Sequence, residues 1–243
     1  MKISVVIPVY NSGQSLSVLY QRLIKVLAEE AADFELVFID DASKDDSFEK
    51  LRRLQKEDRR VKLIRLAKNY GQQQALFCGF QYITGDLVIT IDDDLQHPPE
   101  EIPLLLRKME QGYDVVFGIP ITRQHAYYRN LGSAGIAWVL GLICRKPKGI
   151  RTSSFRVLRA RVVREICRTE RSFIYLAPLI FAATQRVANV NVRHEIRQFG
   201  HSGYDMFKLM KLAVKLIVYY SFIGKLIPCQ HQPRFEIAER ILG

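Results

Sequence analysis

The chain has 243 residues, of which 48% are hydrophobic and 25% are charged. This is the composition of a globular protein, it excludes a disordered chain, and the length suits one sizeable domain with or without an appendage. The net charge of +11 indicates an anionic partner, such as a phosphate-bearing ligand, a nucleic acid or an acidic membrane surface. The four cysteines fit no metal-binding spacing and are typical of free thiols in a reducing compartment.

The first 120 residues alternate between apolar runs and amphipathic segments. Five mostly apolar runs are predicted to be strands, at 3–9, 34–39, 61–66, 87–91 and 114–118. The first is almost continuously apolar and β-branched, as a buried strand of a parallel sheet is. The segments between the five runs have helical spacing or helix-start signals, with a helix expected at 72–83 and another opened by Pro98 and Pro99. The short connections predict an open, mostly parallel α/β sheet flanked by helices.

The pattern is less regular after residue 120. We expect helices at 128–144 and near 158–168, a late strand within 184–196, and a final helix from Tyr204 to about Ile223. Residues 1–200 are therefore predicted to form the main domain, and residues 201–243 an amphipathic helical tail.

Polar residues follow four of the expected strands. They are Tyr10-Asn11, Asp40-Asp41, Lys68-Asn69 and Asp92-Asp93-Asp94. Ligands of open α/β sheets bind beyond the carboxyl ends of the strands, so these residues are expected to border one binding site.

The run Asp92-Asp93-Asp94 is the strongest single signal. Three successive carboxylates repel one another and need a cation or protonation. In an extended segment Asp92 and Asp94 point to the same side and Asp93 points away, and Gln96 adds a neutral oxygen on the ligand side. Mg²⁺ typically takes one or two carboxylates plus substrate phosphates, so the run predicts a metal site. The alternative is an acidic turn that caps the helix opened by Pro98.

Two common nucleotide-binding signatures are absent. No GxGxxG follows the first strand, and no GxxxxGK[ST] occurs in the chain. A nucleotide bound here would therefore be held through a metal ion and through contacts to its base.

Four segments together resemble the family 2 glycosyltransferases over about residues 1–160. They are VVIPVYN, FIDDASKD, NYGQQQAL and GDLVITIDDDLQHPPE. The QHPPE ending and the following GYDVVFG are most similar to the polyprenyl-phosphate branch, the dolichyl-phosphate mannose synthase-like enzymes. The sequence departs from the family pattern at Ser12, where an acid is frequent, and at Asp93, where Ala is frequent.

The resemblance implies a GT-A fold and an inverting, metal-dependent hexosyl transfer from a nucleotide diphosphate sugar. It implies that Asp92, Asp94 and Gln96 hold Mg²⁺ or Mn²⁺ on the diphosphate, where the ion neutralises the leaving group. The residues expected to contact the nucleotide sugar are Pro8, Tyr10, Asn11, Asp40, Asp41, Gly71, Asp92 and Asp93.

The acceptor is suggested by what the second half of the chain contains. A sugar hydroxyl acceptor needs a carboxylate base, yet no Glu-Asp pair follows residue 58, and Arg145–Arg171 holds ten Lys or Arg against Glu165 and Glu170. A phosphate acceptor is already ionised and needs cations, preferably arginines.

In the polyprenyl-phosphate branch, paired arginines match Arg123 and Arg129, and a Phe-Arg segment matches Arg156, although Ser154 stands where the branch often has an acid. The residues expected to bind the acceptor phosphate are Arg123, Arg129, Arg151, Arg156 and Arg197. The expected catalytic set is Asp92, Asp94, Arg123 and Arg129.

The final helix carries Lys208, Lys211 and Lys215 on one stripe and is predicted to lie in a membrane interface. Its apolar run LIVYYSFI is too short to span a bilayer. The alternative is a helix packed on the α/β core. The preceding RQFGHSGY resembles the stretch before the interface helices of the same branch.

The leading hypothesis is thus an enzyme, peripheral on the cytoplasmic face of the membrane, that transfers a sugar to a polyprenyl phosphate of undecaprenyl or dolichyl type. A membrane-protein partner or a homo-oligomer is compatible with it. The alternative is transfer to a saccharide hydroxyl in cell-surface polysaccharide synthesis, with Glu165 or Glu170 as the base. Nucleic-acid binding is allowed by the charge but is not expected, because the metal motif is intact.

Overall fold

The computed structural model describes residues 1–121, 141, 144, 146–171, 173–195, 206–220 and 235–242. Most of the helix predicted at 128–144 lies outside these ranges.

One eight-stranded sheet organises the described residues, in the order β7-β5-β6-β4-β1-β2-β3-β8. The strands are β1 Lys2–Val9, β2 Asp33–Asp40, β3 Val61–Leu66, β4 Leu87–Thr90, β5 Val115–Pro120, β6 Arg156–Arg159, β7 Val187–Val192 and β8 Ile237–Ile241. Strands β1 to β4 are mutually parallel where they pair, and β5 pairs in parallel with β7. The predicted open, mostly parallel sheet is confirmed.

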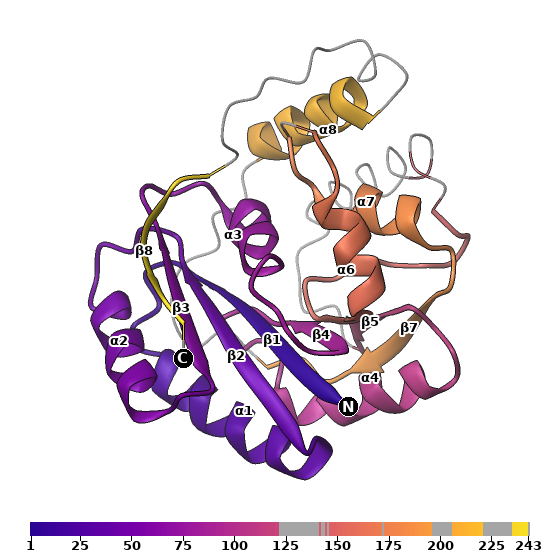
Figure 1. The fold of residues 1–243 in the computed structure, drawn as a ribbon. Helices are drawn as coiled ribbons and strands as arrows, with labels where there is room; N and C mark the ends of the chain where they lie inside the picture. The colour runs from indigo at the N-terminus through magenta and orange to yellow at the C-terminus, as the bar shows by residue number, and fades with distance from the viewer. Residues whose placement is uncertain are drawn as a thin grey trace.

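Helices cover both faces of the sheet (Figure 1). They are α1 Leu16–Glu30, α2 Ser47–Glu57, α3 Gln72–Gly79, α4 Ile102–Glu110 with the short 3-10 helix η1 Pro99–Glu101 before it, α6 Ala160–Cys167, α7 Leu176–Ala183 and α8 Met206–Tyr220. Along β1, Ile3, Val5 and Ile7 pack with α1, α2 and α4, whereas Val6 packs with α3, α6 and α7. The alternation of side chains along a strand therefore divides the core into two layers.

Two strands run against the parallel direction, and neither was expected. Residues 156–159, which lie partly in the predicted helix near 158–168, form β6 between β4 and β5, antiparallel to both. Strand β8 pairs antiparallel with β3 at the far edge of the sheet. The segment 201–243, predicted as a helical tail, therefore ends in a strand of the main sheet.

Helix α8 has two different faces. Leu216 is fully buried, and Leu212 and Tyr220 pack against the same core layer as α3, α6 and α7. Val214 and Ile217 remain 55% and 42% exposed. The helix thus packs on the α/β core with one face and presents an apolar pair on the other. No helix among the described residues has the length and apolar character needed to cross a membrane.

Candidate functional site

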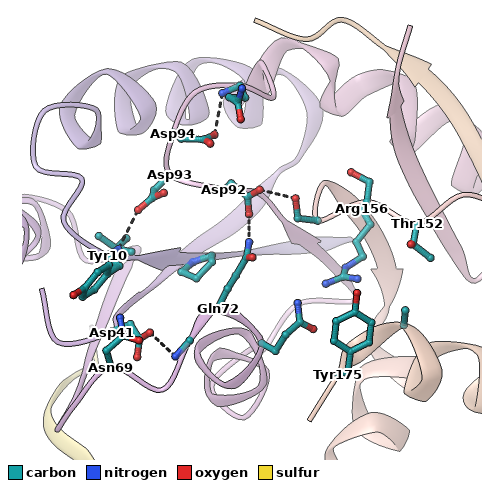
Figure 2. A pocket seen from close by; sticks show the side chains of 18 residues that line it. Tyr10, Asp41, Asn69, Gln72, Asp92, Asp93, Asp94, Thr152, Arg156 and Tyr175 are labelled. Carbon is teal, nitrogen blue, oxygen red and sulfur yellow. Dashed lines mark hydrogen bonds between the residues drawn. The ribbon is translucent and has the colours of Figure 1, made fainter. Parts of the chain in front are cut away.

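A pocket of about 550 Å³ opens at the carboxyl ends of the parallel strands. Its lining comes from the ends of β1, β2, β3 and β4, from the segment leading into β6, and from the start of α7 (Figure 2). The lining residues are Pro8, Val9, Tyr10, Asp41, Asn69, Gly71, Gln72, Gln73, Asp92, Asp93, Asp94, Gln96, Thr152, Ser153, Ser154, Arg156, Tyr175 and Ala177. The pocket lies where the strand-end residues predicted it.

The acidic run after β4 does not continue the strand. Strand β4 ends at Thr90, Asp93 and Asp94 form a turn, and Leu95 has a positive φ of 61°. The extended geometry that would place Asp92 and Asp94 on one side and Asp93 on the other is therefore wrong. All three carboxylates border the pocket.

The carboxylates of Asp92 and Asp93 point to different partners (Figure 2). Asp92 accepts hydrogen bonds from Gln72 Nε2 at 2.5 Å and from Ser154 Oγ at 2.5 Å. Asp93 Oδ2 accepts from the backbone N–H of Tyr10 at 3.1 Å. Asp92 is thus tied to the β6 side of the pocket and Asp93 to the end of β1.

The charges of the run suit a cation. Burial raises the pKa of Asp92 to about 6 and the pKa of Asp93 to about 7, and the neighbouring carboxylates add to both shifts. Asp94 Oδ1 accepts from the backbone N–H of Gln96 at 3.1 Å, and both side chains border the pocket. No three His, Cys, Asp or Glu side chains of the described ranges form a metal-binding group. Two carboxylates and one amide would therefore leave much of the coordination shell to phosphate oxygens, as Mg²⁺ sites do.

The residue after β2 holds the loop that follows β3. Asp41 accepts hydrogen bonds from the backbone N–H of Tyr70 at 2.7 Å and of Gly71 at 2.8 Å, and it borders the pocket. Asp40 is fully buried, accepts from the backbone N–H of Ser43 at 3.2 Å and lies 3.2 Å from Arg65 Nε. Asp40 is outside the pocket lining, so it can support the site only from behind.

The three residues at the end of β1 that were expected to contact the nucleotide do not all border the pocket. Pro8 and Tyr10 border the pocket, and Tyr10 is 42% exposed. Asn11 has a positive φ of 54°, its side-chain oxygen accepts from the backbone N–H of Lys44, and it is outside the pocket lining. Of the three residues expected to wall the base and ribose, the structure therefore brings two to the pocket.

A buried arginine stands on the opposite wall. Arg156 is 4% exposed, and its Nε donates to Thr90 Oγ1 at 3.1 Å. Its side chain lies beside Tyr175 in Figure 2. Burial lowers the pKa of Arg156 to about 10, although Asp92 partly offsets this shift, so the guanidinium is charged at neutral pH.

Of the other predicted acceptor arginines, the structure describes Arg151, which is not brought to this wall. Arg151 is exposed, its backbone N–H donates to Asn189 Oδ1 at 2.8 Å, and it is outside the pocket lining. Arg123, Arg129 and Arg197 lie outside the described residues.

The β6 and α7 side of the pocket contains no carboxylate among the described residues. Its lining consists of Thr152, Ser153, Ser154, Arg156, Tyr175 and Ala177. Glu165 and Glu170, the bases considered for a hydroxyl acceptor, are outside the lining, and Glu165 pairs with Arg168 at 2.9 Å.

Several lining residues had no assigned role in the sequence. Gln72 and Gln73 belong to the quoted motif NYGQQQAL, so the signal for them was present. Gln73 Oε1 accepts from the backbone N–H of Leu176 at 3.0 Å and so ties α3 to the start of α7. Tyr175 and Ala177 lie in a segment without a recognisable motif, and only the packing of α7 brings them to the pocket.

The sequence model of the family described as "Glycosyl transferase family 2" matches residues 4–167. Among solved structures, glucosyl-3-phosphoglycerate synthase from Mycobacterium tuberculosis, in complex with Mn²⁺, UDP-glucose and phosphoglyceric acid, has a TM-score of 0.62 and 16% identity, and the match covers 89% of this chain and 77% of that chain.

TarS from S. aureus has a TM-score of 0.55 and 14% identity, and the match covers 93% of this chain but only 41% of the TarS chain. TarS 1-349 in complex with UDP-GlcNAc has a TM-score of 0.54 and 16% identity, with 93% and 69% of the two chains covered. At such identities the likeness shows the fold, and the predicted GT-A fold is confirmed.

Proposed function

Because this chain belongs to glycosyl transferase family 2, we propose that it is an inverting enzyme that transfers a sugar from a nucleotide diphosphate sugar to a polyprenyl phosphate. One observation carries the choice of acceptor. On the β6 and α7 side of the pocket, the described lining has a buried arginine, Arg156, and no carboxylate. Such a wall can hold an anion, and the carboxylate that reaches it, Asp92 through Ser154, is assigned to the metal rather than to a hydroxyl base.

The donor is proposed to occupy the side formed by β1, β2 and β4. Pro8, Tyr10 and Asp41 border the space for the base and ribose, with Gly71 beside Asp41. Asp40 and Asn11 support these residues from outside the lining. The donor residues lie on strand ends that the sheet holds rigidly, which favours accurate placement of the sugar.

The metal is proposed to be Mg²⁺ or Mn²⁺. Asp92, Asp94 and Gln96 would hold it, since their oxygens are of the kind that hard divalent ions prefer. When bound, the ion supplies positive charge for the diphosphate that leaves as the glycosidic bond breaks.

The acceptor is proposed to present its phosphate to Arg156. A phosphate oxygen is ionised at neutral pH and can attack the sugar without a base, so binding and orientation are the tasks left to the protein. Arg123, Arg129, Arg151 and Arg197 remain proposed phosphate ligands on the sequence alone. The glucosyl-3-phosphoglycerate synthase complex holds phosphoglyceric acid, so a phosphorylated acceptor is compatible with this fold.

The enzyme is proposed to work as a peripheral protein on the cytoplasmic membrane face. Exposed Lys211 and Lys215 lie on α8 beside the exposed apolar residues Val214 and Ile217. Cations beside apolar side chains suit an interface of anionic headgroups and acyl chains. We place catalysis in residues 1–200, with β8 completing the sheet and α8 as the membrane-contacting element.

Incubation of the full chain with undecaprenyl phosphate, Mg²⁺ or Mn²⁺, and labelled UDP-, GDP- and dTDP-sugars tests the proposal. We expect one sugar to appear in a lipid-linked product, with far less product from Asp94→Ala. Parallel reactions contain phosphoglyceric acid or an oligosaccharide as the acceptor. Product only with phosphoglyceric acid would retain the phosphate site and exclude the lipid, and product only with the oligosaccharide would establish the hydroxyl alternative.

A further inference from the structure

Three consecutive residues after β7 hold the segment that follows the acidic run. We call residues 193–195 the strap. Arg193 donates to the buried Glu101, from its backbone N–H to Oε2 at 3.0 Å and from Nε to Oε1 at 2.6 Å. At the other end of the strap, the backbone N–H of Glu195 donates to the backbone oxygen of Gln96 at 2.9 Å. The strap thus holds both ends of the segment 96–101.

The middle of the strap makes a ring contact. The ring of His194 meets the ring of His97 edge-on, with 5.1 Å between centroids. His97 is 7% exposed, and its ring also stacks on that of Phe155, with 5.2 Å between centroids. Phe155 directly precedes Arg156, so His97 lies between the strap and the segment that carries the proposed acceptor arginine.

Arg22 of α1 joins the strap to η1, and we call its hydrogen bonds to Glu100 and Glu195 the clamp. Arg22 of α1 donates to Glu100 from Nε at 2.9 Å and from Nη2 at 2.6 Å, and to Glu195 from Nη2 at 2.8 Å. The planar guanidinium fixes the directions of its hydrogen bonds, so one arginine that binds two carboxylates fixes their relative position. Arg22 therefore joins α1, η1 and the strap.

These contacts converge on the proposed metal ligands. The strap holds the backbone oxygen of Gln96, and the backbone N–H of Gln96 donates to Asp94 Oδ1 at 3.1 Å. Displacement of the strap would therefore move Gln96 and weaken the hydrogen bond that orients the Asp94 carboxylate. Groups that orient metal ligands contribute to metal affinity without touching the metal.

We propose that the strap, clamped by Arg22, positions Asp94 and Gln96 for the divalent cation. Arg22 and Glu195 are positioning residues of the donor site. The inference rests on the proposed function, because the proposed function assigns a divalent cation to the donor site. It also links the cation to the acceptor wall through His97 and Phe155.

The test compares two ion pairs. Arg22→Ala and Glu195→Gln break the clamp. Arg52→Ala and Glu239→Gln break a pair elsewhere, between α2 and β8, with a separation of 3.1 Å. The two ion pairs are comparable in exposure, because the side chains of Glu195 and Glu239 are both 37% exposed. Arg22→Lys keeps the positive charge but loses the planar guanidinium that binds both carboxylates.

Mn²⁺ affinity is measured by electron paramagnetic resonance in the presence of UDP, together with hydrogen exchange of residues 92–97 without ligand. We expect Arg22→Ala to weaken Mn²⁺ binding roughly tenfold, the lower end for groups that orient metal ligands, and to speed exchange in 92–97. Glu195→Gln and Arg22→Lys should have smaller effects in the same direction, and both Arg52→Ala and Glu239→Gln should match the wild type.

Two results would overturn the proposal. One is wild-type Mn²⁺ affinity and exchange in Arg22→Ala. The other is a loss of UDP affinity in the absence of metal that equals the loss of Mn²⁺ affinity, because it would indicate that Arg22→Ala damages the whole donor site. If the wild type itself bound no Mn²⁺, the metal site of the proposed function would fail. Hydrogen exchange would still decide whether the strap orders residues 92–97. If Arg22→Ala does not fold, Arg22→Lys and Glu195→Gln provide the same comparison.

Discussion

Ser154 Oγ donates a hydrogen bond to Asp92 Oδ2 at 2.5 Å, which joins the two walls of the pocket. Ser154 precedes β6, and Asp92 follows β4. The polyprenyl-phosphate branch that the sequence resembles often has an acid at this position. A carboxylate there would face Asp92 with like charge, whereas the hydroxyl of Ser154 stabilises the charged form of Asp92.

Ser154→Ala should therefore weaken the donor site without unfolding the protein. Loss of a hydrogen bond to a charged group costs about 1.5 to 3 kcal/mol, so we expect Mn²⁺-dependent UDP affinity to fall by roughly tenfold or more. Titration calorimetry with UDP and Mn²⁺ measures it. Thr184→Ala is the control, because the Thr184 hydroxyl donates to the carboxylate of Asp114, which lies outside the pocket lining. Equal affinities for both variants would remove Ser154 from the site.

Asp94→Ala and Asp93→Ala should damage transfer unequally. Asp94 is a proposed metal ligand, and its loss is expected to reduce kcat on the order of 100-fold or more, as loss of a charge-stabilising group does. Asp93 holds the backbone N–H of Tyr10, and its loss is expected to cost roughly tenfold, as loss of one charged hydrogen bond does. Initial rates over a range of Mn²⁺ concentrations distinguish the two. Equal loss would mean that Asp93 also binds the metal.

Arg156→Lys should affect the acceptor more than the donor. Lysine keeps the positive charge but cannot bind two phosphate oxygens in one plane. We expect the acceptor KM to rise roughly tenfold, because a charge-assisted hydrogen bond contributes about 1.5 to 3 kcal/mol, and the nucleotide-sugar KM to stay near the wild-type value. The control is Arg168→Lys on the exposed pair with Glu165. An unchanged acceptor KM would place the phosphate elsewhere.

Glu165→Gln and Glu170→Gln distinguish the two acceptor classes. Both acids are outside the lining of the described pocket, so transfer to a phosphate acceptor should stay within about twofold of the wild type, the range expected of surface substitutions. A loss of transfer to a soluble oligosaccharide in either variant, measured by product chromatography, would favour the hydroxyl alternative.

Glu35→Gln should reduce stability in a pH-dependent way. Burial of Glu35 raises its pKa, but hydrogen bonds from Lys62, Ser4 and Thr84 outweigh it, so the pKa is lowered from 4.5. A carboxyl with a lowered pKa stabilises the fold above its unfolded value, and this contribution is lost as the pH falls through the folded value.

We expect Glu35→Gln to lower the free energy of unfolding by about 3 kcal/mol at neutral pH, because it leaves the Lys62 charge without its partner. The difference from the wild type should shrink below the unfolded pKa of 4.5. Urea unfolding at several pH values measures it. A constant difference would show that the ion pair does not titrate in this range.

The sequence predicted the parallel half of the sheet because β1, β2, β4 and β5 are mostly apolar runs buried on both faces, and β3 has only Lys62 and Arg65 among its apolar residues. The four-residue strand β6, RVLR, has too few apolar residues to distinguish it from a helix. Helix α7, LAPLIFAA, is apolar almost all round, so it has no amphipathic period to reveal it. Such short elements are decided by tertiary packing rather than by local pattern.

The pocket followed from the strand ends, but the orientation of its carboxylates did not. Leu95 has a positive φ, Asp93 and Asp94 form a turn, and the carboxylates of Asp93 and Asp92 accept hydrogen bonds from Tyr10 and from the segment before β6. Those partners are between 62 and 83 residues away along the chain. A repeat of two residues along a strand could not anticipate them.

Strand β8 also prevents edge-to-edge association between copies of this chain. It occupies the hydrogen-bonding edge of β3, whose sequence VKLIRL would otherwise present unpaired backbone groups beside Leu63 and Ile64. The charged residues Glu239 and Arg240 now occupy that border and discourage further strands from adding to it. A chain shortened before Phe235 should therefore associate into growing sheets, and light scattering would detect this before any loss of catalysis was measured.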